Sequence, residues 1–198
     1  QIDPELIVIG PHSQAAREKG VVRVAGRVGS TVEGVVKRAH CPVMIVNEAG
    51  AAVTPPFRRI LVGVDFSASC ECALAFAAKL SGTGGAKLFV FHMIPVPPQP
   101  GYTQDDYEAD VKTATKRLQS FGQESIGGVE PEYGIQGGAH PHLEILKWAA
   151  GKAVDVIVMG SHTKAEEGKW YPGSAVERVS SRSNCPVIVV TDPTTLKP

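Results

Sequence analysis

The chain has 198 residues, enough for one large or two small domains, and 43% of them are hydrophobic, so a sizeable core can be buried. Lys plus Arg and Asp plus Glu each total 20, and this balance argues against a general nucleic-acid binder, an acidic tail or a polybasic membrane patch. Apolar runs fall far short of the about 20 residues of a transmembrane helix, and no secretory leader opens the sequence, so we expect a cytoplasmic protein.

Apolar strands and helices alternate along the predicted chain. Strands are predicted at 6–9, 43–46, 60–65, 87–94, 132–136, 156–159 and 186–190, and helices at 67–80, 104–124, 141–150 and 174–183. Continuously apolar strands that alternate with helices predict an α/β fold, with an open, parallel, five-stranded sheet in the complete unit and helices on both faces. In such a sheet the ligand crevice lies beyond the carboxyl ends of the strands.

Three sequence blocks occur twice in the same order. Residues 5–13 (ELIVIGPHS) match 155–163 (DVIVMGSHT), 29–33 (GSTVE) match 173–177 (GSAVE), and 41–46 (CPVMIV) match 185–190 (CPVIVV). The offset is 150 residues at the first block and 144 at the other two, so the earlier copy carries six extra residues after Ser13. This pattern predicts a duplication.

The two copies differ in what precedes the shared blocks. The second copy has 101 residues from Arg59 up to Gly160, whereas the first has nine before Gly10, so about 92 residues would be missing if the copies were alike. We therefore expect residue 1 not to be a natural start. The predicted domains are 1–47, the C-terminal part of a first unit; 48–57, a linker rich in Ala and Pro; 58–192, a complete unit; and 193–198, a tail.

The loop that follows the strand at 156–159 carries the signal for phosphate binding. Gly160 ends the strand, Gly173 lies at the far end of the loop, and Ser174 opens a helix. Glycine lets the main chain approach a ligand closely, and a helix start offers N–H groups and the positive end of a dipole to phosphate. The same residues also suit an ordinary strand, loop and helix in which Ser174 is only a helix cap.

Together these segments resemble the universal stress protein family. The resemblance is carried by 60–67 (ILVGVDFS), 92–94 (HMI), 155–160, 173–179 (GSAVERV) and 185–190, and it extends over 58–192 and the matching piece 2–47. It implies a Rossmann-like fold of the adenine-nucleotide α-hydrolase type, arranged here as a tandem repeat. It also implies a regulatory protein of the stress response that binds ATP or AMP, with or without Mg²⁺, and hydrolyses ATP slowly at most.

ATP-binding members of that family carry Gly, two residues, Gly, nine residues, Gly, and then Ser or Thr. Thr163 replaces the second Gly here, where its side chain would crowd the phosphates or its hydroxyl would bind them. The resemblance assigns the phosphates to Gly160, Thr163, Gly173, Ser174 and Ala175, the ribose to Asp65, the adenine to the main chain of Met93, and one wall to Gly63 and Val64. The first copy has Ser13 and a 15-residue loop instead, so we do not expect it to bind ATP by itself.

Two other classes of function remain open: a protein-interaction module that has lost its nucleotide, and an adenylating enzyme of the wider superfamily. The sequence contains no catalytic signature, so no catalytic residue is assigned. Cys41, Cys70, Cys72 and Cys185 lack the spacing of a metal site and are expected to be small buried or half-buried thiols. The pair His140 and His142 lacks a third ligand and is interpreted as capping and surface residues.

The last strands of the two copies lie at 43–46 and 187–190. In the resembling family such strands pair antiparallel between two domains, which predicts either a pseudo-dimer within this chain or a homodimer. The segment Leu6–Ile9 is expected to leave an open sheet edge, through which a second chain could also associate.

Overall fold

The structure is a computed structural model that describes residues 4–10, 28–46, 56–161 and 174–191. Its elements follow the order β1 (Ile7–Ile9), α1 (Ser30–Arg38), β2 (Val43–Ile45), β3 (Arg59–Gly63), α2 (Ala68–Gly84), β4 (Lys87–Pro95), α3 (Gln104–Ser120), β5 (Glu132–Gly138), α4 (Pro141–Gly151), β6 (Val156–Gly160), α5 (Ala175–Arg182) and β7 (Val187–Val190). None of the described helices is long and apolar enough to cross a membrane.

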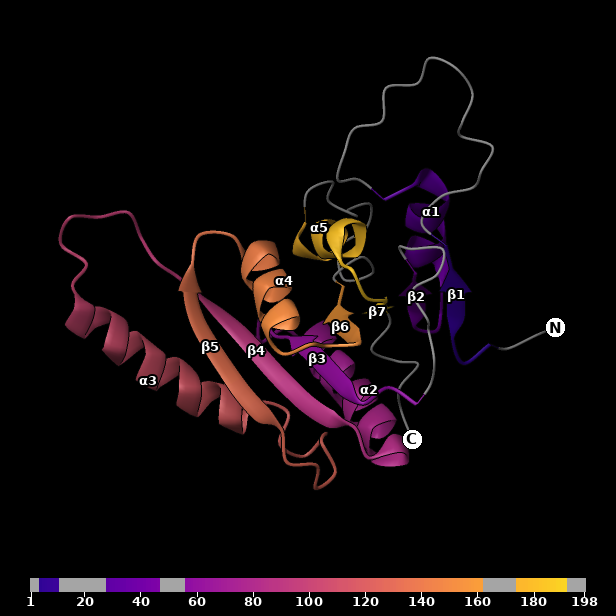
Figure 1. Ribbon diagram of the computed structural model, residues 1–198, viewed down its shortest axis with the longest axis horizontal. Coiled ribbons are helices and arrows are strands. Elements are labelled where there is room, and N and C mark those ends of the chain that lie inside the picture. The colour runs from indigo at the N-terminus through magenta and orange to yellow at the C-terminus, as the bar shows by residue number, and fades with distance from the viewer. Residues whose placement is uncertain (1–3, 11–27, 47–55, 162–173, 192–198) are drawn as a thin grey trace, which may run out of the picture.

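All of these strands join one sheet in the order β1-β2-β7-β6-β3-β4-β5 (Figure 1). Neighbouring strands are parallel except β2 and β7, which are antiparallel. The complete unit contributes the five strands expected of it, but the whole sheet is larger than that, because the described residues form a seven-stranded one. The five strands after residue 56 are parallel, and β1 and β2 extend the sheet because the main chain of β2 pairs with β7.

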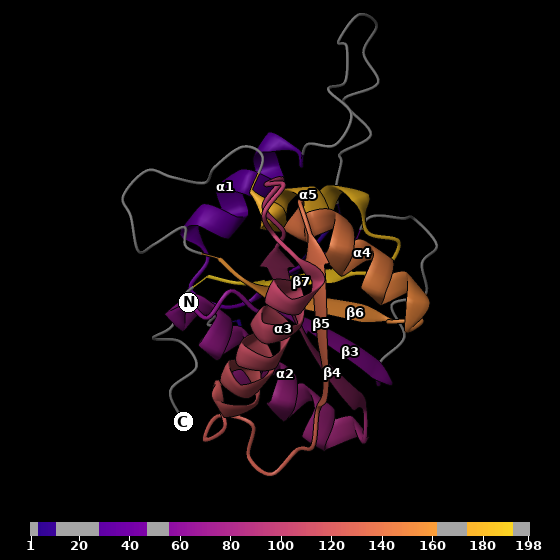
Figure 2. The same ribbon diagram turned by 90° about the vertical axis from the view of Figure 1, so that its left-hand side faces the viewer.

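The helices cover both faces of the sheet, as the continuously apolar strands predict (Figures 1 and 2). On one face, Ile60 and Val62 of β3 pack with residues of α2 and with Leu118 of α3. On the other face, Leu61 packs in a second cluster with residues of α1, α4 and α5. Successive residues of β3 thus point into different cores, and this explains why the strand is apolar without a break from Ile60 to Val62.

The antiparallel junction between β2 and β7 is three residues long. Val43 lies opposite Val189, Met44 opposite Ile188, and Ile45 opposite Val187. The antiparallel pairing predicted for these two segments is confirmed, and it occurs within a single chain. Because β7 also pairs with β6 on its other side, both edges of β7 are used.

Two helix ends differ from those predicted. The expected break at Ser81 is wrong, because α2 continues through the small residues to Gly84 and ends at Gly85, whose φ of 63° is left-handed. Buried packing of its inner face outweighs the weak helix propensity of glycine. Helix α3 ends earlier than expected, at Ser120, because Gly122 adopts a φ of 63° and leads the chain away from the helix.

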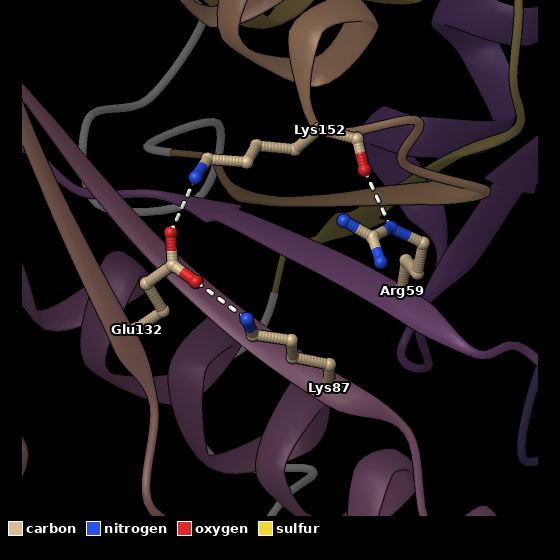
Figure 3. Close-up of polar contacts among 4 residues, drawn as sticks. All are labelled: Arg59, Lys87, Glu132 and Lys152. Atoms are coloured by element: carbon tan, nitrogen blue, oxygen red, sulfur yellow. Dashed lines mark hydrogen bonds and ion pairs between the residues drawn. The ribbon is translucent and has the colours of Figure 1, made fainter.

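A cluster of ion pairs joins the amino ends of β4 and β5 to the end of α4 (Figure 3). The carboxylate of Glu132 lies 2.6 Å from Nζ of Lys87 and 2.5 Å from Nζ of Lys152. Nε of Arg59 donates to the carbonyl of Lys152, and these three cations lie within 6 Å of the centre of the Phe89 ring. Hydrogen bonds from Lys152 and then Lys87 lower the pKa of Glu132 to about 2.

Replacing Glu132 with Gln should lower the stability of the fold in a pH-dependent way. A folded-state pKa below the ordinary value of about 4.3 makes Glu132 stabilising above pH ~5, and this contribution is lost as the pH falls towards 2. The Glu132 side chain is 33% exposed, so we expect a loss of at most about 1 kcal/mol at pH 7. Urea unfolding of both proteins from pH 7 to pH 2 measures the difference.

The control is Glu130→Gln, which removes the same charge two residues away at an exposed position. Its unfolding free energy should follow that of the wild type at every pH. A constant difference between Glu132→Gln and the wild type across the whole range would contradict the electrostatic role.

Candidate functional site

A cavity of about 200 Å³ lies at the carboxyl ends of β3, β4 and β6. Parallel strands place these ends at one edge of the sheet, and α5 begins beside them. Seven of the predicted site residues line the cavity: Gly63, Val64, Asp65, Met93, Gly160, Ser174 and Ala175. The other two, Thr163 and Gly173, lie outside the described residues. The structure therefore brings these seven residues together in one wall, and their role in binding stays a prediction.

Other residues line the cavity that the sequence did not single out. They are Cys70, Phe91, His92, Pro141, Ile145, Met159 and Val176. Phe91 and His92 directly precede Met93 on β4, so their position beside a predicted site residue was the sequence feature that could have identified them. Pro141 and Ile145 lie at the start of α4, and sequence alone did not show that this helix packs over the ends of β3 and β6.

Residue 160 lies in the cavity wall, and close packing also requires it to be a glycine. A Cβ at this position would collide with the main-chain carbonyl of Ser69 and with the N atom of Cys70. Main-chain atoms cannot move aside like the end of a side chain, so only glycine fits between β6 and the first turn of α2. The sequence interpretation gave Gly160 a role towards phosphate alone and missed this contact.

The turn after β3 holds Asp65 at the mouth of the cavity. Its Oδ1 accepts a hydrogen bond from the N–H of Ser67 at 2.9 Å, and Ser67 in turn caps α2 by accepting from the N–H of Cys70 at 3.2 Å. Between them, Phe66 has a φ of 65°, a conformation that non-glycine residues adopt rarely and at an energetic cost. Its ring is held by the guanidinium of Arg117, 4.0 Å away.

His92 connects this turn to β4. Its Nδ1 lies 2.8 Å from the carbonyl oxygen of Val64, and its ring lies 4.4 Å from that of Phe66. A carbonyl only accepts hydrogen bonds, so Nδ1 carries the hydrogen and the neutral ring has its lone pair on Nε2. His92 thereby fixes the main chain of Val64 in the cavity wall.

Helix α5 begins at the opposite wall. The hydroxyl oxygen of Ser174 accepts a hydrogen bond from the N–H of Glu177 at 3.2 Å, so Ser174 is the cap of this helix. The structure thus bears out the capping role that the sequence left open. That bond uses the oxygen as an acceptor, and the hydroxyl hydrogen can still be donated to a ligand.

A buried thiol lies at the base of the cavity. Cys70 is 3% exposed, and its Sγ lies 3.5 Å from the carbonyl oxygen of Gly63. The pKa of this thiol is raised to about 12, mainly because the thiol is buried and, to a smaller extent, because the negative charge of Asp65 is nearby. All four cysteines are thiols, with Cys41 and Cys70 buried and the other two half-buried, as expected.

One expectation about the histidines is wrong. The sequence pattern favours a capping and surface role for His142, but this residue is buried, with an exposed fraction of 5%. Burial and the nearby charges of Arg178 and Arg182 lower its pKa. His140 does precede α4, although its side chain makes no capping hydrogen bond. The described residues contain no group of three or more His, Cys, Asp or Glu that could hold a metal ion.

Comparison with known proteins identifies the family. The sequence model of the universal stress protein family matches residues 56–191, more than half of the chain. The chain belongs to the universal stress protein family. The family match covers one universal stress protein domain and does not include residues 1–47.

Several universal stress proteins are similar to the chain. A relative from Thermus aquaticus is 31% identical over 137 residues, which are 68% of this chain and 98% of the relative. A solved universal stress protein from Archaeoglobus fulgidus is 27% identical, with a TM-score of 0.67 over 94% of this chain and 62% of its own. The chain likewise spans 62% of the length of relatives from Mycobacterium tuberculosis.

One structural relative was solved with a nucleotide. It is a universal stress protein in complex with cAMP, 21% identical, with a TM-score of 0.52 over 68% of this chain and 97% of its own. At this identity the likeness shows the shared fold. Universal stress protein domains of this fold therefore include a nucleotide binder.

Gly160→Ala should destabilise the domain strongly. The added methyl group meets the main chain of α2, and the strain should cost on the order of 3 kcal/mol. Gly82→Ala is the matched control, because Gly82 is an exposed helical glycine with open space around its Cβ position, and it should be neutral or stabilising by about 0.5–1 kcal/mol. Thermal unfolding followed by circular dichroism tests both, and equal melting temperatures for the two variants would contradict the packing argument.

Cys70 should resist alkylation although it lines a cavity. With a pKa of about 12, its thiolate fraction at pH 8 is about one in ten thousand, and only the thiolate reacts. Iodoacetamide labelling of the native protein, read by mass spectrometry, should modify Cys72 before Cys70. Cys72 is the internal control, because it is half-buried and lies on the same helix. Faster labelling of Cys70 would mean that its thiol is activated instead.

Proposed function

We propose that residues 56–191 bind an adenine nucleotide, ATP or AMP, and that the protein regulates a stress response through this binding. The observation that carries the proposal is the convergence of seven predicted residues on one cavity at the carboxyl ends of β3, β4 and β6. This is the edge at which open parallel sheets bind their ligands. The cavity is smaller than the about 300 Å³ of a typical small-molecule site, so the described wall would enclose part of the nucleotide.

The positions of these residues support a specific orientation of the ligand. The main chain of Met93, at the end of β4, would meet the adenine, and the exposed carboxylate of Asp65 would accept hydrogen bonds from the ribose hydroxyls. The start of α5 would receive the phosphates, because Ser174 and Ala175 stand at the positive end of the helix dipole. Gly160 lines the cavity beside them, and Thr163 and Gly173 would complete the phosphate end.

The described cavity wall suits binding better than catalysis. Cys70 is protonated at neutral pH, and His92 uses Nδ1 to hold the carbonyl of Val64. We therefore propose a regulatory binder with slow hydrolysis at most. The described residues offer no metal-binding cluster, so a Mg²⁺ ion that accompanies ATP would be held chiefly by the phosphates.

We further propose that residues 1–47 are part of a second domain of the same kind. The support is the internal similarity of β1, α1 and β2 to β6, α5 and β7. The N–H of Ile7 donates to the carbonyl of Pro42 at 3.0 Å, and the N–H of Ile157 donates to that of Pro186 at 3.0 Å. On this proposal the β2–β7 ladder is a pseudo-dimer interface inside one chain. We propose the cytoplasm as its location, because cysteines kept as thiols are typical of a reducing compartment.

Nucleotide binding can be tested on the whole chain. Isothermal titration should detect ATP or AMP binding, and Asp65→Ala should weaken it about 10- to 100-fold, the worth of hydrogen bonds to a charged group. Asp105→Ala, which removes an exposed carboxylate from α3 outside the cavity, is the control and should bind like the wild type.

Two results would count against this function. If the folded wild type binds neither nucleotide and carries none in native mass spectrometry, the nucleotide proposal fails and the interaction module becomes the better hypothesis. If both variants bind like the wild type, the nucleotide does not use Asp65 and the proposed orientation is wrong.

A further inference from the structure

The hydrogen-bond ladder between β3 and β4 ends where the candidate cavity begins. At its start, the N–H of Lys87 donates to the carbonyl of Arg58 at 2.8 Å. At its end, the N–H of Val64 donates to the carbonyl of Phe91 at 2.8 Å. Main-chain groups of alternate residues face the same neighbouring strand, so Met93 is the next residue of β4 that faces β3. A continued ladder would bring the N–H of Met93 to the carbonyl of Val64.

The side chain of His92 takes the place of that next bond. Its Nδ1 donates to the carbonyl oxygen of Val64, 2.8 Å away, and among the described residues no hydrogen bond joins this oxygen to the N–H of Met93. Strand β3 accordingly ends at Gly63, whereas β4 runs on to Pro95. The main-chain N–H and C=O of Met93 therefore face the space beyond the end of β3, where Met93 lines the cavity.

The turn after β3 holds the imidazole ring in this position. The ring of Phe66 lies 4.4 Å from that of His92, and the guanidinium of Arg117, from α3, lies 4.0 Å from the centre of the Phe66 ring. With a φ of 65°, Phe66 also departs from the extended conformation of a strand. The chain therefore leaves the ladder after Val64, and no further residue of it pairs with Met93.

We propose that His92 is a positioning residue for the base of the nucleotide, an inference that rests on the proposed function. By donating to the carbonyl of Val64, His92 leaves one main-chain donor and one main-chain acceptor of Met93 available to the edge of the base. Adenine presents its 6-amino donor beside a ring-nitrogen acceptor, which complements such a pair. His92 acts on the base through Met93.

The same geometry predicts the result of removing the imidazole. Val64 is 6% exposed, and a buried carbonyl without a partner is costly. In His92→Leu this carbonyl should instead accept from the N–H of Met93, which lengthens the ladder by one bond and closes the base site. The side-chain amide of Asn offers an N–H donor in place of Nδ1, so His92→Asn should keep the arrangement of the wild type.

The first test is amide hydrogen exchange of the nucleotide-free whole chain, followed by NMR. In the wild type and in His92→Asn, the N–H of Met93 should exchange at least about tenfold faster than that of Phe91, which lies within the ladder. In His92→Leu, the N–H of Met93 should exchange at least about tenfold more slowly than in the wild type.

The second test is isothermal titration with ATP and with purine riboside triphosphate, which lacks the 6-amino group. His92→Leu should weaken ATP binding about tenfold or more and reduce the preference for ATP over the analogue, and His92→Asn should restore both. His40→Leu is the matched control, because His40 is an exposed histidine between α1 and β2, outside the cavity wall. A merely structural role would lower the melting temperature of His92→Leu without changing the preference.

Failure of this inference differs from failure of the proposed function. If the folded wild type binds neither ATP nor AMP, the proposed function fails, and the exchange of Met93 alone decides the role of His92. With nucleotide binding intact, the inference is overturned if His92→Leu binds ATP as tightly as the wild type or if His92→Asn does not restore binding. It is also overturned if the N–H of Met93 is as protected as that of Phe91 in the wild type, a result that needs no variant to fold.

Discussion

The close approach of α2 to Gly160 is the constraint on which the candidate site depends. The first turn of α2 lies where a side chain at residue 160 would be, so the end of β6 and the start of α2 are fixed against each other. The loop after β3 leads directly into that helix and therefore has little freedom. Asp65, Ser67 and Cys70 are positioned by the same contact, and the cavity takes its shape from it. The absence of a Cβ at residue 160 thus helps to set the shape of the candidate site.

The two ends of the sheet perform different tasks. At the amino ends, Glu132 draws together Lys87 and Lys152 and fastens β4, β5 and the end of α4. At the carboxyl ends the chain forms the wall of the candidate cavity. A left-handed backbone at a non-glycine residue, which is energetically unfavourable, occurs at both ends, at Phe66 after β3 and at Ala153 beside the ion-pair cluster. Packing of Phe66 against one apolar core helps to offset this cost.

The sequence predicted those parts of the structure that depend on local pattern. Continuous apolar runs such as 60–63 indicated a parallel sheet buried on both faces, and the Ser174 position indicated a helix start. The sequence failed where distant residues decide the outcome. The continuation of α2 through Gly82 depends on packing against the sheet, and the burial of His142 depends on α5, which follows it by some 30 residues in the chain. Part of the cavity wall could be predicted because the carboxyl ends of parallel strands meet at one edge of the sheet. The residues that α4 adds to this wall could not be predicted, because their position depends on the order of the strands in the sheet.

The β2–β7 ladder has a consequence for the order in which the molecule folds. It joins residues such as Met44 and Ile188, which are 144 positions apart in the chain. Closing a loop of that length costs about 4 kcal/mol of chain entropy before any contact compensates for it, and three paired residues recover little of that by themselves. The ladder therefore gains its stability only after β3, β4 and β6 have assembled a surface for β7. We therefore expect the unit formed by β1, α1 and β2 to dock last and to open first, and its amide hydrogens to exchange with solvent through a partial unfolding that leaves the central strands intact.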